Sequence, residues 1–330
     1  MLKFLIFRTD RIGDFIFSRM LTESIKLKYP NSKIDFVCSK YNSKYIKNFK
    51  DIKKIYVLDK YNLTMLTKNL IQINKSNYDY LIILDGKRRS IFYSILMKAK
   101  KKFVILKDFR PSLTLKLFFD KYFVNSEANS QFNNFSVIIN YLNLRVPEKI
   151  NYYNDYKFKN LNEKLNTKFT LLHLDEKWFE GFYHNDYQYM SLDYKNFDLL
   201  INSIFKKFKK RVILTTGNIQ MSDFDKIIEA NFYKKRRNVF YSNKYKDNLI
   251  YIEHTSFRDL EKIVKKSSSI VCCEGAISHV SNAFNIKTIA LINKISLKTA
   301  IYWTKHMSNI RLVYRDNIKS ICSQISNVKF

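Results

Sequence analysis

The feature that most constrains the fold is a regular alternation of short apolar runs with stretches of helical periodicity. The first apolar run, 2–7, is followed by Phe17, Met20, Leu21 and Ile25 at helical spacing. This alternation is typical of βαβ units, which build a parallel sheet covered by helices. The same signals predict further strands at 34–37, 55–58, 80–84, 103–106, 169–174, 212–216, 249–252, 269–273 and 288–292. They predict further helices at 63–73, from Pro111, at 136–144, 197–208, 223–230, 256–266, 277–284 and 316–327.

The alternation is interrupted once, by a polar and aromatic segment at 151–166, and then restarts. A chain of 330 residues with 46% hydrophobic residues can bury two cores. We therefore predict an α/β protein with a first Rossmann-like domain over 1–150, a linker over 151–166 and a second Rossmann-like domain over 167–330. Each domain is an open sheet, and the two are expected to face a cleft.

The chain carries a formal net charge of +30. A field of this sign attracts nucleic acid, anionic lipid headgroups or phosphorylated substrates. A composition rich in Lys and Asn can also reflect a biased genome, in which case much of the charge is incidental. Arg, the better reader of base edges, supplies only 13 of the 59 basic residues, which argues against sequence-specific nucleic-acid recognition.

The four cysteines form no CxxC pair and no Cys/His ligand spacing, so we predict reduced thiols and no metal site. No apolar run is long enough to span a bilayer. We expect a cytoplasmic protein that can attach peripherally to the inner membrane.

The segment Arg8-Thr9-Asp10-Arg11-Ile12-Gly13-Asp14 lies where the first strand passes into the first helix. In open parallel sheets, ligands bind beyond the carboxyl ends of strands. Gly13 lets a ligand approach the backbone, and Asp14 falls in the first turn of the helix, where its carboxylate gains from the positive end of the dipole. The alternative is that Asp14 only caps the helix.

Two later strand ends also carry polar residues. His173-Leu174-Asp175-Glu176-Lys177-Trp178 offers Lys177 as a point charge for a phosphate, or else forms a solvated loop. In the segment 272–279, Glu274 ends a strand, and Gly275 and Ala276 leave the backbone open before a helix that contains Ser278 and His279. The free N–H groups of such a helix suit a diphosphate, and the carboxylate suits sugar hydroxyls, although His279 can equally be a core residue.

Together these segments resemble the heptosyltransferase family, which is glycosyltransferase family 9 of lipopolysaccharide synthesis. The opening R-T-D-R-I-G-D-F-I-F-S is similar to that family's R-x-D-x-I-G-D segment. The segment E-G-A-I-S-H-V-S-N-A-F-N-I-K-T-I-A-L is similar to its D-[ST]-G-x-x-H-x-A-x-A-L-x-x-P-x-x-x-L segment. The order and spacing agree over nearly the whole chain.

The resemblance implies a GT-B architecture and inverting, metal-independent transfer from a nucleotide-sugar to a lipid-linked glycan acceptor. Asp14 is then the general base, within an acceptor-side turn that includes Arg8, Asp10, Arg11 and Gly13. Donor binding falls to Lys177, Thr215, Thr216, Glu274, Gly275, Ala276, Ser278 and His279. No cofactor is implied apart from the nucleotide-sugar itself.

Three departures from the family pattern bear on the donor. Glu274 stands where the family has Asp, Gly275-Ala276 replaces Ser/Thr-Gly, and the proline is missing at Lys287-Thr288. ADP-heptose is the donor that the family suggests, and another nucleotide-sugar is the alternative.

Between Lys87 and Lys116 there are ten basic residues and one acidic residue. Each Lys or Arg near an anionic leaflet contributes about 1 kcal/mol. We predict that this segment faces the inner membrane; a solvated charged surface is the alternative. The residues assigned to this contact are Arg88, Arg89, Lys100, Lys101 and Lys102.

Three other functions stay open. One is a different GT-B enzyme acting on a nucleotide-sugar, such as an epimerase. Another is a non-catalytic basic protein that binds nucleic acid or glycan, although the sequence contains no recognised nucleic-acid motif. The third is a transferase that binds its donor through Glu274-Gly275-Ala276 without turnover.

Overall fold

The computed structural model describes residues 1–59, 61–106, 113–126, 128–150, 167–178, 193–217, 222–236, 238–253 and 255–330, without the side chains of 114, 222, 223 and 236. The chain divides into two compact units, unit 1 at Met1–Lys157 and unit 2 at Phe158–Phe330. The linker predicted at 151–166 and the helix start predicted at Pro111 lie outside the described residues.

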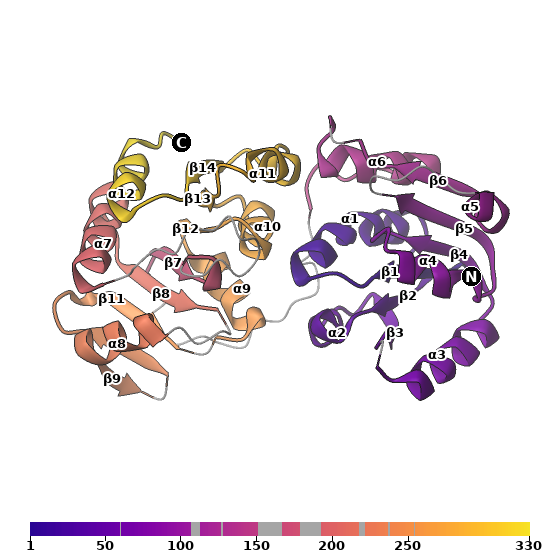
Figure 1. Cartoon of the computed structure of the whole chain (residues 1–330), viewed down its shortest axis with the longest axis horizontal. Coiled ribbons are helices and arrows are strands. Elements are labelled where there is room, and N and C mark those ends of the chain that lie inside the picture. Colours follow the sequence, from indigo (N-terminus) through magenta and orange to yellow (C-terminus); the bar gives the residue numbers. More distant parts are fainter. Residues whose placement is uncertain are drawn as a thin grey trace. The chain divides into compact units, whose positions relative to one another are not determined.

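Unit 1 is built on a six-stranded sheet in which all the described pairs are parallel, with the order β3-β2-β1-β4-β5-β6 (Figure 1). The chain runs outward from β1 to β3 and then returns to place β4 against β1. The strand order therefore reverses between β1 and β4, where ligands bind in open α/β sheets. The strands are β1 (Lys3–Arg8), β2 (Lys33–Cys38), β3 (Ile52–Val57), β4 (Tyr78–Ile83), β5 (Ala99–Leu106) and β6 (Lys121–Val124).

Helices cover both faces of this sheet. The helices of unit 1 are α1 (Ile12–Lys28), α2 (Lys40–Ile46), α3 (Leu63–Lys75), α4 (Arg88–Ile95), α5 (Leu113–Phe118) and α6 (Gln131–Tyr141). Successive residues of a strand point to opposite faces, so Leu5 and Phe7 of β1 share one face and belong to the core cluster that α3, α4 and α5 cover. On the other face α1 packs against α6, where the rings of Phe17 and Phe135 are 5.1 Å apart.

Unit 2 contains an eight-stranded sheet with the order β14-β13-β12-β7-β8-β11-β10-β9. Here the chain runs outward from β7 and returns at β12, so the strand order reverses between β7 and β12. This sheet is mixed, because β10 pairs antiparallel with both β9 and β11, whereas the other described pairs are parallel. The strands are β7 (Thr170–Leu174), β8 (Val212–Thr216), β9 (Phe232–Arg236), β10 (Val239–Ser242), β11 (Lys246–Ile252), β12 (Ser269–Cys273), β13 (Lys287–Ile292) and β14 (Ile310–Tyr314).

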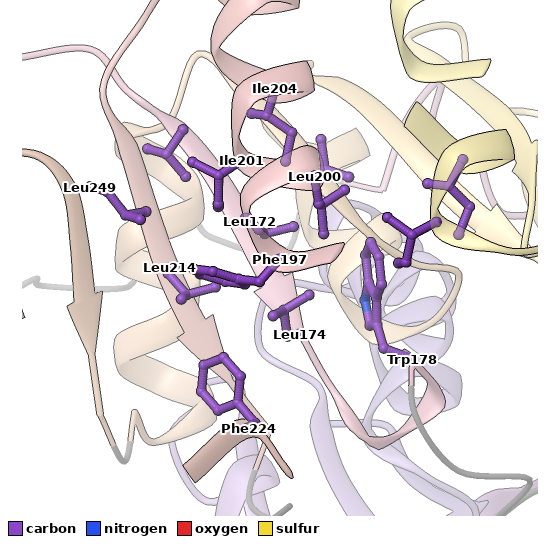
Figure 2. Close-up of a cluster of buried hydrophobic side chains, with 14 of the residues drawn as sticks. Leu172, Leu174, Trp178, Phe197, Leu200, Ile201, Ile204, Leu214, Phe224 and Leu249 are labelled. Carbon is purple, nitrogen blue, oxygen red and sulfur yellow. The ribbon is translucent and has the colours of Figure 1, made fainter. Parts of the chain in front are cut away.

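One face of this sheet packs on a large apolar core, shown in Figure 2. Trp178 is fully buried in it beside Phe197 and Leu200 of α7. Burying side chains of this size contributes on the order of 2 kcal/mol each, and the core holds the ends of β7 and β8 rigidly. The helices of unit 2 are α7 (Tyr194–Phe208), α8 (Ser222–Asn231), α9 (Phe257–Lys266), α10 (Ala276–Ala283), α11 (Leu297–Thr304) and α12 (Ile318–Asn327).

Candidate functional site

Arg8 ties together three elements at the point where the strand order of unit 1 reverses. Its side chain is only 2% exposed. The guanidinium donates to the carbonyl oxygen of Leu84, just after β4, at 2.6 Å, and to the carbonyl oxygen of Asp14 at 3.1 Å. It also lies 3.2 Å from the carboxylate of Asp14. A fork of five donors suits such bridging, so Arg8 fixes the start of α1 against the ends of β1 and β4.

Asp14 closes the first turn of α1 and keeps part of its side chain accessible. Its Oδ2 accepts the backbone N–H of Arg11, the N-cap residue, at 3.2 Å, in a capping-box arrangement. The side chain remains 25% exposed. The sequence offered capping and catalysis as alternatives. The N-cap residue is Arg11, so Asp14 is not itself the N-cap but accepts the N–H of Arg11 from the third helical position. Its catalytic role stays a prediction.

A second carboxylate, Asp85, supports the same turn from the side of β4, and the sequence predicted no role for it. It is 1% exposed, and one oxygen accepts the N–H and hydroxyl of Thr9 at 3.1 and 2.6 Å and the hydroxyl of Ser90 at 2.8 Å. The sequence signal is an apolar strand that stops at Asp85-Gly86. In the structure Gly86 has a φ of 58°, a conformation that favours glycine.

Asp10 and Lys87 complete the polar group on unit 1. The Lys87 ammonium lies 2.5 Å from one carboxylate oxygen of Asp10, and the Arg8 guanidinium lies 3.6 Å from the other. Lys87 comes from the loop after β4, so it reaches Asp10 across the same reversal point. The edge therefore presents two carboxylates, Asp10 and Asp14, that are anchored by cations.

In unit 2 the structure brings Lys177 and the Glu274 segment together, as predicted. Lys177 lies in a short 3₁₀ helix, Glu176–Trp178, directly after β7. Its ammonium donates to the carbonyl oxygen of Glu274, directly after β12, at 2.5 Å. A Cβ added to Gly275 would lie 2.7 Å from that ammonium nitrogen. A glycine at 275 is thus what allows the lysine to approach the backbone here.

The same segment forms the N-terminus of helix α10, directly after the carboxyl end of β12. Gly275 is the N-cap residue, and its N–H lies 3.4 Å from the hydroxyl of Ser278, as donor to acceptor. The first N–H groups of a helix have no partner within it, so they favour an anion at this position. Ala276 is the first helical residue, and the Lys177 ammonium adds positive charge beside it. This end of unit 2 is suited to hold a diphosphate.

Thr215 and Thr216 end β8, next to β7, but their hydroxyls turn inward. The Thr215 hydroxyl lies 3.0 Å from Nδ1 of His173, and the Thr216 hydroxyl lies 3.3 Å from the hydroxyl of Tyr251. Both threonines are buried. Donor contact through these hydroxyls stays a prediction, because in this structure they bond within the unit.

His279 packs among aromatic rings that the sequence did not connect with it. It is 3% exposed, with the ring of Trp303 at 5.9 Å edge-on and the ring of His306 at 6.5 Å nearly parallel. Trp303 lies in α11 and His306 just after it. Aromatic rings in this geometry contribute beyond their buried area. The cluster holds His279 in place, which fits its alternative reading as a core residue and leaves its donor contact as a prediction.

The stability of unit 2 should depend on pH through His173 and His306. Burial lowers the pKa of each to about 4 from 6.5. Between these values the unfolded chain binds protons that the folded chain does not, so the free energy of unfolding should fall as the pH falls from about 6.5 to about 4. The effect is on the order of 3 kcal/mol for the fully buried His173. Burial raises the pKa of Asp175, which acts in the opposite direction and reduces the slope.

Urea titrations followed by tryptophan fluorescence measure this dependence. The two tryptophans, Trp178 and Trp303, both belong to unit 2, so the signal reports that unit. A His306→Gln variant should show a shallower loss of stability in acid than the natural protein. An unfolding free energy that stays level from pH 7 to pH 5 would contradict the prediction.

The residues predicted to face a membrane do not lie together. Arg88 and Arg89 begin α4, beyond the carboxyl end of β4. Lys100, Lys101 and Lys102 lie at the opposite, amino end of β5, which runs parallel to β4. Lys100 also pairs with Asp79 at 2.8 Å, and Lys102 donates to the carbonyl oxygen of Ser94.

Within the ranges given above, there is no group of three or more His, Cys, Asp or Glu side chains that could hold a metal ion. Over the same part of the chain, no helix combines the length and apolar character needed to cross a membrane.

In each unit, the predicted site residues lie at the reversal point of strand order, on a parallel sheet in unit 1 and on a mixed sheet in unit 2. This is the fold of known glycosyltransferases. The heptosyltransferase WaaC of E. coli with ADP has a TM-score of 0.67 at 10% identity, covering 99% of this chain and 100% of that one. The glycosyl transferase family 9 protein of Veillonella parvula has a TM-score of 0.68 at 11% identity, covering 99% and 94%.

A UDP-GlcNAc 2-epimerase of Methanocaldococcus jannaschii is also similar, with a TM-score of 0.55 at 14% identity, covering 99% of this chain and 94% of that one. No protein-family model matches the sequence, and no curated protein does. The fold predicted through the heptosyltransferase resemblance is therefore confirmed, and the activity is argued below from the site.

Proposed function

We propose that this protein is an inverting, metal-independent glycosyltransferase that moves a heptose-like sugar from a nucleotide-sugar to a lipopolysaccharide-core or other cell-surface glycan acceptor. The observation that supports it most is the contact between Lys177 and Glu274 at the N-terminus of α10. The similar structure of WaaC contains ADP, and another structure of WaaC contains ADP-2-deoxy-2-fluoro heptose. These support ADP-heptose as the donor, with another nucleotide-sugar as the alternative.

Transfer from a nucleotide-sugar leaves a diphosphate with developing negative charge. In this proposal, Lys177 and the N–H groups that open α10 stabilise that charge. Donors that are fixed before the reaction need no reorganisation during it. Such a site can assist departure of the leaving group without a metal, and we assign the carboxylate of Glu274 to the binding of sugar hydroxyls.

Inversion takes place in a single displacement and needs one base for the acceptor hydroxyl. Asp14 fits this role because it is a partly exposed carboxylate held at the reversal point of unit 1 by Arg8 and the N–H of Arg11. A positioned base contributes roughly 10²–10⁴ in rate. Asp10 lies on the same turn and can orient acceptor hydroxyls.

The acceptor that this function requires is lipid-linked, and we place the enzyme in the cytoplasm with peripheral attachment to the anionic inner leaflet. The net charge of +30 favours that surface. No specific nucleic acid is part of the proposal.

Donor binding should raise the thermal stability of unit 2. A ligand at 100 times its dissociation constant adds about 2.7 kcal/mol, which corresponds to about 5–10 °C for a unit of this size. Tryptophan fluorescence with a panel of ADP-, UDP-, GDP- and CMP-sugars measures the shift. Lys177→Met should reduce it for the ligand that binds. If none of these nucleotide-sugars produces a shift, the proposal is wrong.

The similarity to a UDP-GlcNAc 2-epimerase supports a second candidate, an enzyme that isomerises a nucleotide-sugar. Product analysis separates the two functions. A transferase releases the nucleoside diphosphate only when an acceptor is present, apart from slow hydrolysis. An epimerase converts the sugar without an acceptor and releases no nucleotide on that path.

A further inference from the structure

Unit 1 exposes several large apolar side chains on, or directly after, three helices that cover one face of its sheet. Helices α3, α4 and α5 contribute residues to a single core cluster on one face of the sheet. Near their opposite sides, six large side chains are between 48% and 74% exposed. We name these six residues the α3–α5 face: Leu63, Ile71, Phe92, Leu96, Leu113 and Leu117.

The charges on these helices have one sign. The sequences of α3, α4 and α5 contain five Lys or Arg residues and no Asp or Glu. Lys68, Lys75 and Lys116 are all exposed. On α3, Lys68, Ile71 and Lys75 help to line an open cavity of about 550 Å³. Apolar side chains and amines therefore alternate along the exposed side of α3, and α5 also exposes both, with Lys116 next to Leu117.

The composition of the α3–α5 face is that of an interaction site. Single exposed apolar residues are ordinary, but a group of them on adjacent helices marks an interaction site. A second copy of the chain would bring these cations against like charges, which opposes self-association. An anionic bilayer binds both kinds of side chain, because its headgroups attract the lysines and the apolar side chains insert at its acyl boundary.

We propose that the α3–α5 face is the surface by which this protein docks on an anionic membrane. This inference rests on the proposed function, since a lipid-linked acceptor has to be met at the bilayer. It also differs from the sequence prediction, which grouped Lys100, Lys101 and Lys102 with the membrane surface. Those three lysines lie in β5 at the amino edge of the sheet.

Vesicle flotation of the full chain tests the proposal, with phosphatidylcholine vesicles that either contain or lack phosphatidylglycerol. The charge variant is Lys68→Gln with Lys75→Gln and Lys116→Gln. Its matched control removes three exposed lysines outside the face, by Lys101→Gln with Lys210→Gln and Lys319→Gln. Both variants lose the same net charge, so any difference between them reports position.

A separate apolar variant replaces Phe92, Leu113 and Leu117 with Gln. These side chains are exposed, so the variant should fold normally.

We expect the natural protein and the control to float with phosphatidylglycerol vesicles, and the charge variant to bind about 100-fold more weakly. The apolar variant should also bind more weakly, and its remaining binding should be more sensitive to salt. Equal binding by the charge variant and the control would overturn the proposal. So would a natural protein that is dimeric in solution and becomes monomeric in the apolar variant, because the face would then be an interface between copies.

Membrane docking and nucleotide-sugar binding are measured separately. The nucleotide-sugar thermal shift is measured without lipid, and none of the substituted residues belongs to the candidate site. Each variant should therefore keep the thermal shift of the natural protein. A normal shift combined with unchanged vesicle binding removes the docking face and leaves the transferase.

Discussion

Replacing Asp14 with Asn is expected to lower the rate of sugar transfer by about 10²–10⁴ and to leave donor binding unchanged. The amide cannot accept a proton from the acceptor hydroxyl at neutral pH. The donor residues belong to a different unit, whose core does not depend on Asp14. Transfer to a panel of truncated lipopolysaccharide acceptors measures the rate, and the nucleotide-sugar thermal shift measures donor binding.

The structural role of Asp14 has to be separated from its chemical role. An Asn side chain can still accept the N–H of Arg11 through its carbonyl oxygen, but it loses the charge beside the buried Arg8 guanidinium. The loss of stability should therefore be about 1–3 kcal/mol.

Asp259→Asn is a matched control, because Asp259 occupies the same position in α9, three residues after the N-cap Ser256. It should leave activity unchanged, and it should cost less stability because Asp259 pairs with Lys262 of its own helix and not with a buried arginine. If Asp14→Asn transfers sugar at the full rate, Asp14 is a helix cap and not the base.

The sequence predicted the buried strands well because each is a continuous apolar run between polar ends. β8 and β12 have the predicted bounds, and α9 begins after Ser256 as its capping residues indicated. These elements carry their own local signals. A fully buried strand needs apolar residues on both faces, and a cap needs its hydrogen-bonding side chain.

The elements that were missed depend on contacts made elsewhere in the unit. Strand β9 (FYKKR) is short, basic and aromatic, strand β10 (VFYS) is short and aromatic, and the two pair antiparallel, with β9 at the edge of the sheet. Lysines are common on edge strands because they prevent further pairing, so they mask the strand signal. Helix α11 contains no acidic cap and was not predicted.

The candidate site was predictable where a strand end and a motif coincided. Lys177 and Glu274 are 97 residues apart, and the prediction that both serve one ligand depended on the strand-end rule and the family resemblance together. Asp85 was missed because its role lies in the hydrogen bonds it accepts from Thr9 and Ser90, which no local pattern encodes. The membrane prediction grouped charges by position in the chain, and the direction of β5 then separated them.

Substitutions of Lys177 and Gly275 are expected to have the second large effect on the rate of sugar transfer. We expect Lys177→Met to lower transfer about 10²–10³-fold, since it removes a fixed positive charge beside the leaving diphosphate. Gly275→Ala should lower transfer about 10- to 100-fold, the cost of one displaced charge-assisted hydrogen bond. The reason is steric, because the new Cβ would lie 2.7 Å from the Lys177 ammonium, which must then leave the Glu274 carbonyl.

A double-mutant cycle separates this mechanism from general damage to the site. If Gly275→Ala acts by moving the ammonium, it should have little further effect in the Lys177→Met background, because Met ends one atom short of the clash. The free energy of unfolding of unit 2 should be nearly the same in the two single variants, since the displaced group is the flexible end of a side chain. Additive losses of activity in the double variant would mean that Gly275 is needed for the ligand's own approach to the backbone and not for the position of Lys177.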